Sequence, residues 1–187
     1  MSVRDEELGN GDPSDLELVH AGREGDESAL GLLVRRHHAA AYRVAVSLVR
    51  DDDLAQDVVQ DAFMKAFRAL HGFRGDASFR TWLLTITANE ARGALRRHGR
   101  RRETALEDAG PVASDQMNPA QAAMLAQEAG RAREMLEQLP EKQRMSVSLR
   151  IEEGLSFKEI GEVIGSSEGA ARVNYFHGIR RLRELME

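Results

Sequence analysis

The stretch from Leu155 to Leu182 constrains the fold most, because it carries start and stop signals for two short helices in succession. Ser156 and Glu159 have the S-x-x-E spacing of a capping box, in which each side chain satisfies a free backbone N–H group at a helix start. Gly165 follows as a terminator, since glycine adopts the left-handed conformation without a Cβ clash. Either of the next two serines can cap a second helix. The stretch therefore predicts two helices joined by a tight turn.

Each of these two helices has an apolar face. Apolar residues of the first recur at helical spacing: Leu155, Ile160, Val163 and Ile164. The apolar line of the second is formed by Ala171, Tyr175, Gly178, Ile179 and Leu182. Its other face carries Arg172, Asn174, His177, Arg180 and Arg181. This is the outline of a helix-turn-helix, whose second helix enters a DNA major groove, although a helical hairpin with a solvated basic face fits the same pattern.

Composition favours an all-helical protein of one or two domains in a reducing compartment. Alanine, leucine, arginine and glutamate are plentiful, only 4 of the 187 residues are proline, and cysteine is absent. The lack of cysteine excludes disulfides, thiolate nucleophiles and cysteine zinc sites, and suits the cytoplasm. No apolar run approaches the roughly 20 residues of a membrane span, and the N-terminus lacks a signal-peptide layout.

Charge is distributed unevenly along the chain. The formal net charge is −5, which opposes binding to DNA phosphates. However, arginines are concentrated between Arg92 and Arg102, whereas acidic residues crowd the N-terminus and Asp51–Asp53. Because phosphate binding depends on lysine and arginine, we expect the isolated chain to bind DNA weakly and to need a partner that delivers it.

The first 50 residues predict a tail followed by two helices. Residues 1–13 are polar and acidic, which is typical of a disordered tail. Ser14 or Asp15 can cap a short helix, which ends near Gly22–Gly25. A long amphipathic helix follows from Asp26 to Val49.

Two patterns in this part resemble metal sites. Glu17 and His20 have the E-x-x-H spacing of di-iron bundles, but the second such motif that a di-iron site requires is missing. The adjacent His37 and His38 point about 100° apart on a helix and cannot chelate one ion together, so we expect both at the surface or the rim. We therefore predict no metal site.

Asp51–Asp53 opens the next helix, where negative charge complements the helix dipole. Apolar residues between Val58 and Leu70 form its buried side. The opposite side carries residues at three- and four-residue steps: Asp53, Asp57, Gln60, Asp61, Met64, Lys65 and Arg68. Asp61 and Lys65 are spaced for an ion pair. This side is either a solvated face or a docking face, and the spacing fits both.

A glycine-bearing loop from His71 to Ala77 precedes a helix capped by Ser78. We expect four residues of this helix to face inward: Phe79, Trp82, Leu83 and Ile86. A second stripe along it is polar and then strongly basic: Thr81, Thr85, Asn89, Arg92 and Arg96. Amide and guanidinium groups suit base edges and phosphates, and an aromatic-bearing loop beside them suits an unstacked base. A solvated arginine run is the alternative.

Residues 103–118 contain Gly110-Pro111 and lack helical periodicity, so we predict a flexible linker between two domains. Pro119 can open a helix that runs towards Leu139, and Pro140 can open another that ends by Gly154. Together with the helix-turn-helix they predict a smaller second domain over residues 119–187, after a first domain over residues 14–102.

Four blocks of the sequence stand in a fixed order: Asp53–Phe63, Phe73–Leu83, Leu139–Arg144 and Leu155–Ile160. Together they resemble the extracytoplasmic-function (ECF) sigma factors of bacterial RNA polymerase, and the similarity extends from about residue 15 to residue 185. The resemblance implies an all-α fold of two small helical domains, sigma region 2 over residues 14–102 and sigma region 4 over residues 119–187. It also implies that the acidic linker leads towards the RNA exit path.

The resemblance implies a role for each polar surface. The residues implied to dock on the clamp helices of the polymerase β′ subunit are Asp53, Asp57, Gln60, Asp61, Met64 and Lys65. The residues implied to read the −10 element and to capture a flipped base are Phe73, Arg74, Arg80, Thr85, Asn89, Arg92, Arg96 and Arg97. The residues implied to read the −35 element are Lys158, Ser167, Glu168, Gly169, Ala170, Arg172, Val173, Asn174, His177 and Arg180. Region 4 is also expected on the β flap, and an anti-sigma factor is expected as a partner.

The second helix of the helix-turn-helix departs from the family pattern. Family members usually carry a small polar residue and more basic residues early in it, whereas this chain has Ala170, Val173 and Phe176. These side chains cannot hydrogen-bond to base edges, although they can meet thymine methyl groups. The resemblance therefore implies the −35 role but no particular base sequence.

The expected function is that of a promoter-specificity subunit with no cofactor and no enzymatic activity, because the chain contains no nucleophile–base pair or metal cluster. Strand opening would be driven by the binding of an unstacked base. Two alternatives remain. One is a stand-alone helix-turn-helix regulator that binds its operator without polymerase. The other is an all-α interaction protein or enzyme-like bundle, based on Glu17, His20 and the acidic face.

Overall fold

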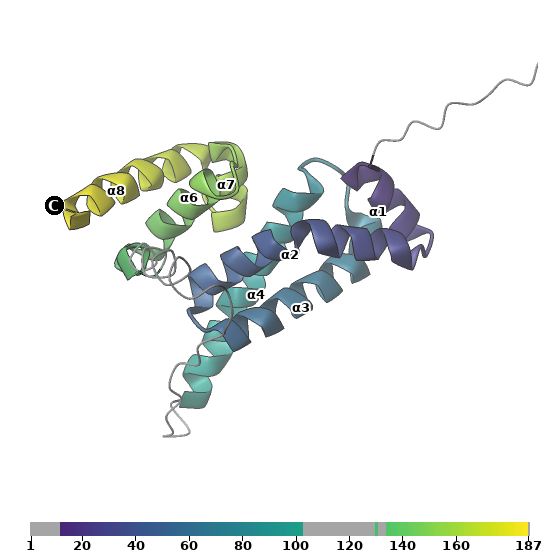
Figure 1. Cartoon of the computed structure of the whole chain (residues 1–187), viewed down its shortest axis with the longest axis horizontal. Coiled ribbons are helices and arrows are strands. Elements are labelled where there is room, and N and C mark those ends of the chain that lie inside the picture. The colour runs from purple at the N-terminus through teal and green to yellow at the C-terminus, as the bar shows by residue number, and fades with distance from the viewer. Residues whose placement is uncertain (1–11, 103–129, 131–133, 187) are drawn as a thin grey trace, which may run out of the picture.

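The structure, a computed structural model, describes residues 12–102, 130 and 134–186, and every regular element within them is helical. The elements are α1 (Asp15–Arg23), α2 (Glu27–Val49), α3 (Asp52–Arg68), the 3-10 helix η1 (Leu70–Gly72), α4 (Phe79–Arg102), α6 (Glu141–Ile151), α7 (Phe157–Ile164) and α8 (Glu168–Met186). They form an N-terminal domain of α1–α4 and a C-terminal domain of α6–α8 (Figure 1). This confirms the predicted all-α fold. Most of the predicted tail, the whole linker at 103–118 and the helix start at Pro119 lie outside the described residues.

Side-chain caps fix the helix starts of the N-terminal domain. Ser14 and Glu17 form a capping box at α1, in which the side chain of Ser14 accepts the N–H of Glu17. Asp26 caps α2 by accepting two backbone N–H groups, and Asp51 caps α3 by accepting the N–H of Leu54 at 2.8 Å. Each such cap stabilises a helix by roughly 1 kcal/mol. These local signals explain why the predicted helix starts agree with the structure.

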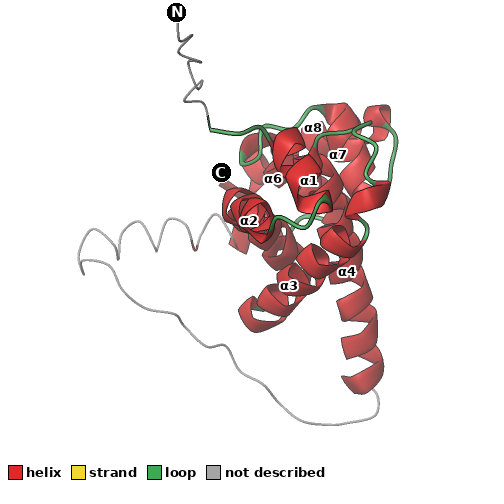
Figure 2. Cartoon of the chain, turned by 90° about the vertical axis from the view of Figure 1, so that its right-hand side faces the viewer, coloured by secondary structure: helices red, strands yellow, loops and turns green. Residues whose placement is uncertain are grey.

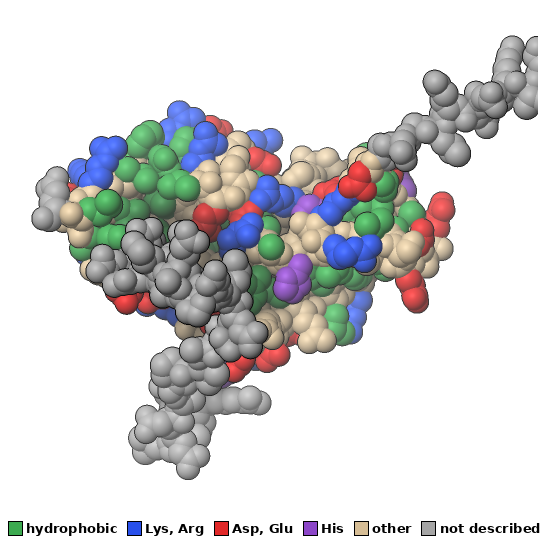
Figure 3. Space-filling view, viewed as in Figure 1, with side chains coloured by type: hydrophobic (Ala, Val, Ile, Leu, Met, Phe, Trp, Pro, Cys, Tyr) green, Lys and Arg blue, Asp and Glu red, His purple; other side chains and the backbone are tan. Residues whose placement is uncertain are grey.

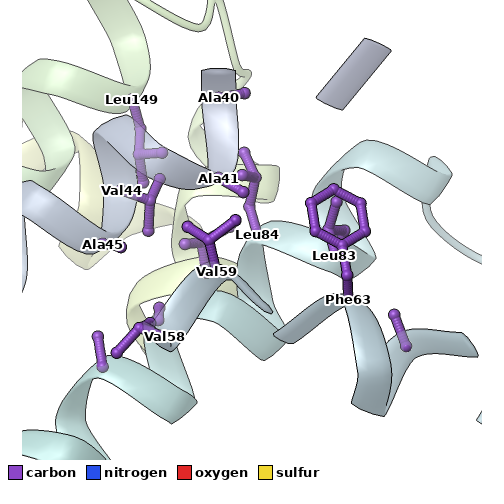
Figure 4. Close-up of a cluster of buried hydrophobic side chains, with 14 of the residues drawn as sticks. Ala40, Ala41, Val44, Ala45, Val58, Val59, Phe63, Leu83, Leu84 and Leu149 are labelled. Atoms are coloured by element: carbon purple, nitrogen blue, oxygen red, sulfur yellow. The ribbon is translucent and has the colours of Figure 1, made fainter. Parts of the chain in front are cut away.

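The core of the N-terminal domain lies between α2, α3 and α4. Small residues on α2 allow the helices to pack closely, and larger side chains fill the space between them. Figure 4 shows Ala40, Ala41, Val44 and Ala45 of α2 facing Val58, Val59 and Phe63 of α3 and Leu83 and Leu84 of α4. This packing sets the position of α4 and of the polar stripe along it.

His37 lies inside this domain, so its predicted surface or rim position is wrong. The residue is 7% exposed, its Nε2 lies 2.7 Å from Oδ2 of Asp15, and its ring packs 5.4 Å from that of Phe79. Burial lowers the pKa of the imidazole, although the carboxylate of Asp15 opposes this effect. Asp15, which contacts His37, belongs to α1. The spacing of residues within α2 does not indicate this contact. The neighbouring His38 is exposed.

The C-terminal domain is built on the close approach of α6 and α8. Gly178 of α8 is buried against α6, and a Cβ at this position would lie 2.7 Å from Cγ2 of Val147. The predicted inner residues of α7 are buried as expected: Ile160, Val163 and Ile164. These contacts hold α7 and α8 in the arrangement of a helix-turn-helix.

The two domains pack against each other through α2 and α4 on one side and α6 and α7 on the other. Leu149 of α6 points towards Val44 of α2 (Figure 4). The hydroxyl of Ser47 donates to the sulfur of Met145 at 3.0 Å, and Nε of the buried Arg144 donates to the main-chain oxygen of Ser47 at 2.8 Å. Figure 2 shows the last turns of α4 extending away from the C-terminal domain. The part of α4 up to Arg92 therefore contacts the C-terminal domain, and the last turns of the helix lead away from it.

Candidate nucleic-acid interface

The first part of the predicted −10 stripe lies at the domain interface. Arg80 is half-buried, and its Nη1 donates to the main-chain oxygen of Glu153 at 2.8 Å. Thr81, the first residue of the stripe and next to Arg80 in the sequence, is fully buried and donates its hydroxyl to Oε1 of Glu159 at 2.9 Å. Thr85 is half-buried, and its hydroxyl donates to the carbonyl of Thr81 at 2.9 Å. These polar groups already have protein partners.

The second part of the stripe is accessible. Asn89, Arg96 and Arg97 are exposed on the part of α4 that leads away from the interface. Between the two parts, Arg92 donates from Nε to Oε1 of Glu141 at 3.0 Å. Exposed guanidinium groups and an amide on adjacent turns of one helix suit contacts with DNA phosphates and base edges.

The loop after η1 has one accessible and one buried candidate. Phe73 is 7% exposed, and its ring lies 6.0 Å from that of Phe79 and 5.0 Å from that of Trp82. It belongs to the aromatic core in this arrangement and cannot stack on a base. Arg74 is exposed and pairs with Asp76 at 3.0 Å. The spacing in the sequence did not distinguish these two environments.

Arg23 holds this loop in place, a role that the sequence did not indicate. Its Nε donates to the main-chain oxygen of Leu70 at 3.0 Å, and its Nη2 donates to the main-chain oxygen of Phe73. Since the two acceptors lie about fifty positions further along the chain, no local pattern could have predicted them. Arg23 therefore positions the loop that precedes α4.

The helix-turn-helix has the predicted local geometry. Ser156 and Glu159 form the capping box at the start of α7, and Gly165 adopts the left-handed conformation with φ of 64°. The N–H of Ser166 donates to the carbonyl of Gly161 at 2.8 Å. A Cβ on Gly161 would lie 2.8 Å from the main-chain oxygen of Ser166. Gly161 is thus a second glycine required by the turn, and sequence analysis missed it.

The outward face of α8 carries most of the predicted −35 residues. The exposed residues are Ser167, just before the helix, and Glu168, Gly169, Arg172, Val173, His177 and Arg180 within it. Lys158 of α7 is exposed as well. Ala170 and Asn174 are half-buried, and the amide of Asn174 donates to the main-chain oxygen of Ala170 at 2.8 Å. The amide of Asn174 is therefore turned back on its own helix. Arg172 also has a partner on this face, because its Nη2 donates to Oε1 of Glu168 at 2.9 Å.

Apolar side chains lie at the centre of this face. Val173 is 55% exposed and Phe176 is 58% exposed. The ring of Phe176 lies 6.4 Å from that of Phe157, over which Arg150 and Arg172 place their guanidinium groups at 5.1 and 5.2 Å. Figure 3 shows hydrophobic side chains gathered over α8 between groups of lysines and arginines. The face therefore offers apolar contacts flanked by positive charge.

The predicted docking residues are all exposed on α3: Asp53, Asp57, Gln60, Asp61, Met64 and Lys65. The carboxylate that pairs with Lys65, at 2.5 Å, is that of Glu90 on α4, whereas the spacing suggested Asp61. Beside these residues lies a groove of about 800 Å³ between α2 and α3. Its lining includes Gln60 and Met64, together with Val34, His38, Tyr42, Phe63 and Phe67.

The described residues contain no group of three His, Cys, Asp or Glu side chains that could hold a metal ion. Glu17, one of the two residues with metal-like spacing, accepts a hydrogen bond from the hydroxyl of Ser14 at 2.6 Å as part of the α1 cap. In the described ranges, no helix combines the length and the apolar composition needed to cross a membrane.

Comparisons with known proteins agree with this arrangement. Residues 33–101 match Sigma-70 region 2 and residues 129–182 match Sigma-70, region 4. The RNA polymerase sigma-H factor of Pseudomonas aeruginosa is 37% identical over 92% of both chains. The ECF RNA polymerase sigma-E factor of Escherichia coli K12 is 36% identical over 93% of both chains.

Solved structures give the same result for the fold. CnrH, in complex with the cytosolic domain of CnrY, has a TM-score of 0.70 and 28% identity, covering 93% of this chain and 97% of that chain. The sigma factor RpoE, in complex with the anti-sigma factor NepR from Bartonella quintana, has a TM-score of 0.66 and 24% identity, covering 83% and 95%.

The fold and its two basic helices define a two-domain protein of the sigma-70 class. Relatives above 30% identity align over nearly the whole length of both domains. The chain belongs to the extracytoplasmic-function (ECF) sigma factors of bacterial RNA polymerase.

Proposed function

We propose that this protein directs core RNA polymerase to specific promoters in the cytoplasm and assists strand opening there by binding DNA, without catalysing a covalent reaction. The observation that carries the proposal is the presence of two basic surfaces on separate domains, one on α4 and one on α8. A single chain with two such surfaces can contact two DNA elements at once. The relatives named RNA polymerase sigma factors, aligned over both domains, support this function.

The −10 surface comprises the exposed residues of α4 and its preceding loop. Asn89, Arg96 and Arg97 contact the backbone and base edges, and Arg74 approaches from the loop. An unstacked base is held by stacking and hydrogen bonds, which offsets the cost of opening the duplex. The burial of Phe73 favours a role for this ring in shaping the loop. A direct contact between Phe73 and a base would require its release from the aromatic core.

The −35 surface is the outward face of α8. Arg172 and Arg180 are positioned to approach phosphates on either side of the central apolar residues. Val173 and Phe176 favour contact with thymine methyl groups over hydrogen bonds to base edges. The polymerase-docking surface is the exposed side of α3, from Asp53 to Lys65, and the adjoining groove suits an amphipathic helix of the β′ subunit.

We also propose an anti-sigma partner that covers the polymerase-docking surface. The B. quintana RpoE structure contains an anti-sigma factor and has the same fold as this chain. The groove between α2 and α3 has an apolar lining, which suits a partner helix. A purification from native cells that recovers this protein with a second small protein, displaced by core polymerase, would support this partner.

Reconstituted transcription tests the proposed function. Core polymerase with this protein should transcribe from a subset of genomic fragments that core polymerase alone ignores. Arg96→Ala should reduce that transcription, because it removes an accessible positive charge from the −10 surface, whereas Arg35→Ala on α2 removes an exposed charge elsewhere and should not. Tight operator binding by the isolated protein, with no effect on polymerase, would instead favour a stand-alone helix-turn-helix regulator.

A further inference from the structure

Arg23, the last residue of α1, holds both ends of η1. Its Nε donates to the main-chain oxygen of Leu70 at 3.0 Å, and its Nη2 donates to the main-chain oxygen of Phe73. Leu70 is the first residue of η1, and Phe73 is the first residue after it. Because the donors of a guanidinium group form a rigid planar fork, this one side chain fixes the two carbonyl groups relative to each other. The start of the loop at residues 73–78, which leads into α4, is therefore attached to α1.

Close packing of α1 on η1 is a second contact, independent of these hydrogen bonds. At Gly22, beside Arg23, an added Cβ would overlap Cδ2 of Leu30 and would lie 3.3 Å from Cδ2 of Leu70. Leu70 is 2% exposed and belongs to the hydrophobic core. The lack of a side chain at Gly22 thus allows α1 to approach both α2 and η1. This approach brings Arg23 within reach of the two carbonyl groups.

The attachment decides which side chains of the loop are buried. The ring of Phe73 is turned into the core, where it packs 6.0 Å from that of Phe79 and 5.0 Å from that of Trp82. The backbone of Phe73 is extended, and successive side chains of an extended chain point to opposite sides. Arg74 is accordingly exposed, with Asp76 as its ion-pair partner at 3.0 Å. A fixed carbonyl at Phe73 therefore keeps the guanidinium group of Arg74 on the outer side of the loop.

We infer that Arg23 is a positioning residue for promoter opening, which keeps the loop in the conformation that receives the unstacked base. This role rests on the proposed −10 function of the loop. A loop that is already ordered avoids the entropy cost of ordering when the base arrives. Arg23 is half-buried and its donors are directed at the protein main chain, so it acts through the loop and not by touching DNA. Its loss should slow opening without weakening docking through α3 or duplex binding through α8.

The environment of Trp82 provides a direct readout of the loop. Trp82 is the one tryptophan of the chain, and the ring of Phe73 packs against it at 5.0 Å. In full-length Arg23→Gln, which removes the forked donors, tryptophan emission should shift to longer wavelength, because release of Phe73 exposes the indole to water. Arg35→Gln removes an exposed arginine from α2 and is the matched control, with emission as in wild type. Unchanged emission in Arg23→Gln would overturn the inference.

The rate of promoter opening provides the functional readout. Core polymerase is combined with each variant, and opening is followed on a transcribed DNA fragment through 2-aminopurine placed in the −10 region. With Arg23→Gln the maximal opening rate should fall roughly tenfold, the effect of losing one hydrogen bond from a charged group, while the holoenzyme concentration for half-maximal rate stays unchanged. Arg23→Lys keeps the charge but not the fork and should recover only part of the rate. A wild-type maximal rate in Arg23→Gln would contradict the role, as would a change confined to the half-maximal concentration.

A second substitution in the loop distinguishes positioning from a general loss of stability. If Arg23 acts by orienting Arg74, Arg23→Gln should slow opening less in an Arg74→Ala background, which has no guanidinium group left to orient, than in wild type. Equal slowing in both backgrounds would mean that Arg23 supports the fold in general and would overturn the inference. Circular dichroism measures the helical content of each protein, and Arg23→Lys takes the place of Arg23→Gln if the latter unfolds. Unfolding of both variants would equally assign Arg23 to the fold alone.

Failure of the proposed function would be visible earlier, in the wild-type protein. Holoenzyme that contains the wild-type protein would then transcribe no DNA fragment that core polymerase alone ignores, whereas the emission of Trp82 would still report whether Arg23 holds the loop. Wild-type transcription together with an Arg23→Gln holoenzyme that opens DNA at the wild-type rate would leave the proposed function intact and overturn only the role of Arg23.

Discussion

Nε of Arg92 donates a hydrogen bond to Oε1 of Glu141 at 3.0 Å, which links the middle of α4 to the first turn of α6. The side chains are 22% and 43% exposed, so water screens the pair. It differs in this respect from the pairs that Arg43 and Arg80 form with Glu153, because the side chain of Glu153 is buried. Loss of one partner should therefore cost less at the exposed pair than at the buried one, where the remaining charge is left without compensation.

Glu141→Gln should change the free energy of unfolding by less than about 1 kcal/mol, because exposed ion pairs contribute little. Urea denaturation followed by circular dichroism measures this change, and the effect should shrink further in high salt. A loss of several kcal/mol would mean that this pair is a main support of the interface.

Ser156→Ala should lower the free energy of unfolding of the C-terminal domain by about 1 kcal/mol, since it removes the N-cap of α7. Ser156→Thr keeps the hydroxyl and should retain most of that stability. Both variants are compared with wild type by thermal denaturation. Equal stability of Ser156→Ala and wild type would contradict the importance of this capping box.

Gly178→Ala should destabilise the protein, although alanine is the better helix former. The new Cβ would lie 2.7 Å from Cγ2 of the buried Val147, and overpacking of this kind typically costs about 1–3 kcal/mol. Gly169→Ala, in the same helix, is the matched control because its Cβ would meet no atom within 4 Å. It should be neutral or stabilising by up to about 1 kcal/mol. The denaturation midpoint of Gly178→Ala should therefore lie below that of wild type, and the midpoint of Gly169→Ala should lie at or above it.

His37 should make stability depend on pH. Burial lowers the pKa of its imidazole below the ordinary value of 6.5. The carboxylate of Asp15 raises this pKa, and the positive charges of Arg80 and Arg36 lower it further. The native state therefore binds fewer protons than the unfolded chain. The stability contribution is complete above pH 6.5 and is lost as the pH falls through the folded pKa. His37→Gln should flatten the decline in unfolding free energy below pH 6.5, whereas His38→Gln, at an exposed position, should leave it unchanged.

The sequence predicted best those features whose causes lie within one or two helical turns. The capping box of Ser156 and Glu159 and the left-handed Gly165 are local, so their geometry followed from residue type and spacing. The apolar faces of the helices followed from periodicity for the same reason.

Features that depend on contacts between distant segments were not predictable from such patterns. Phe73 was assigned to a DNA-contacting loop, but the aromatic rings that bury it could not be recognised as its neighbours. Arg80 and Glu153 are 73 positions apart, and nothing near either residue indicates the pair. Only the packing of the two domains indicates which groups of each proposed surface are accessible.

Met145 and Leu149 have a consequence for how much active protein a cell can hold. Both side chains belong to a core that the two domains share. A molecule with separated domains therefore exposes an apolar surface unless a binding partner covers it. Such molecules are prone to aggregation and degradation. The amount of protein with separated domains in a cell would therefore depend on how many binding partners are present to cover this surface.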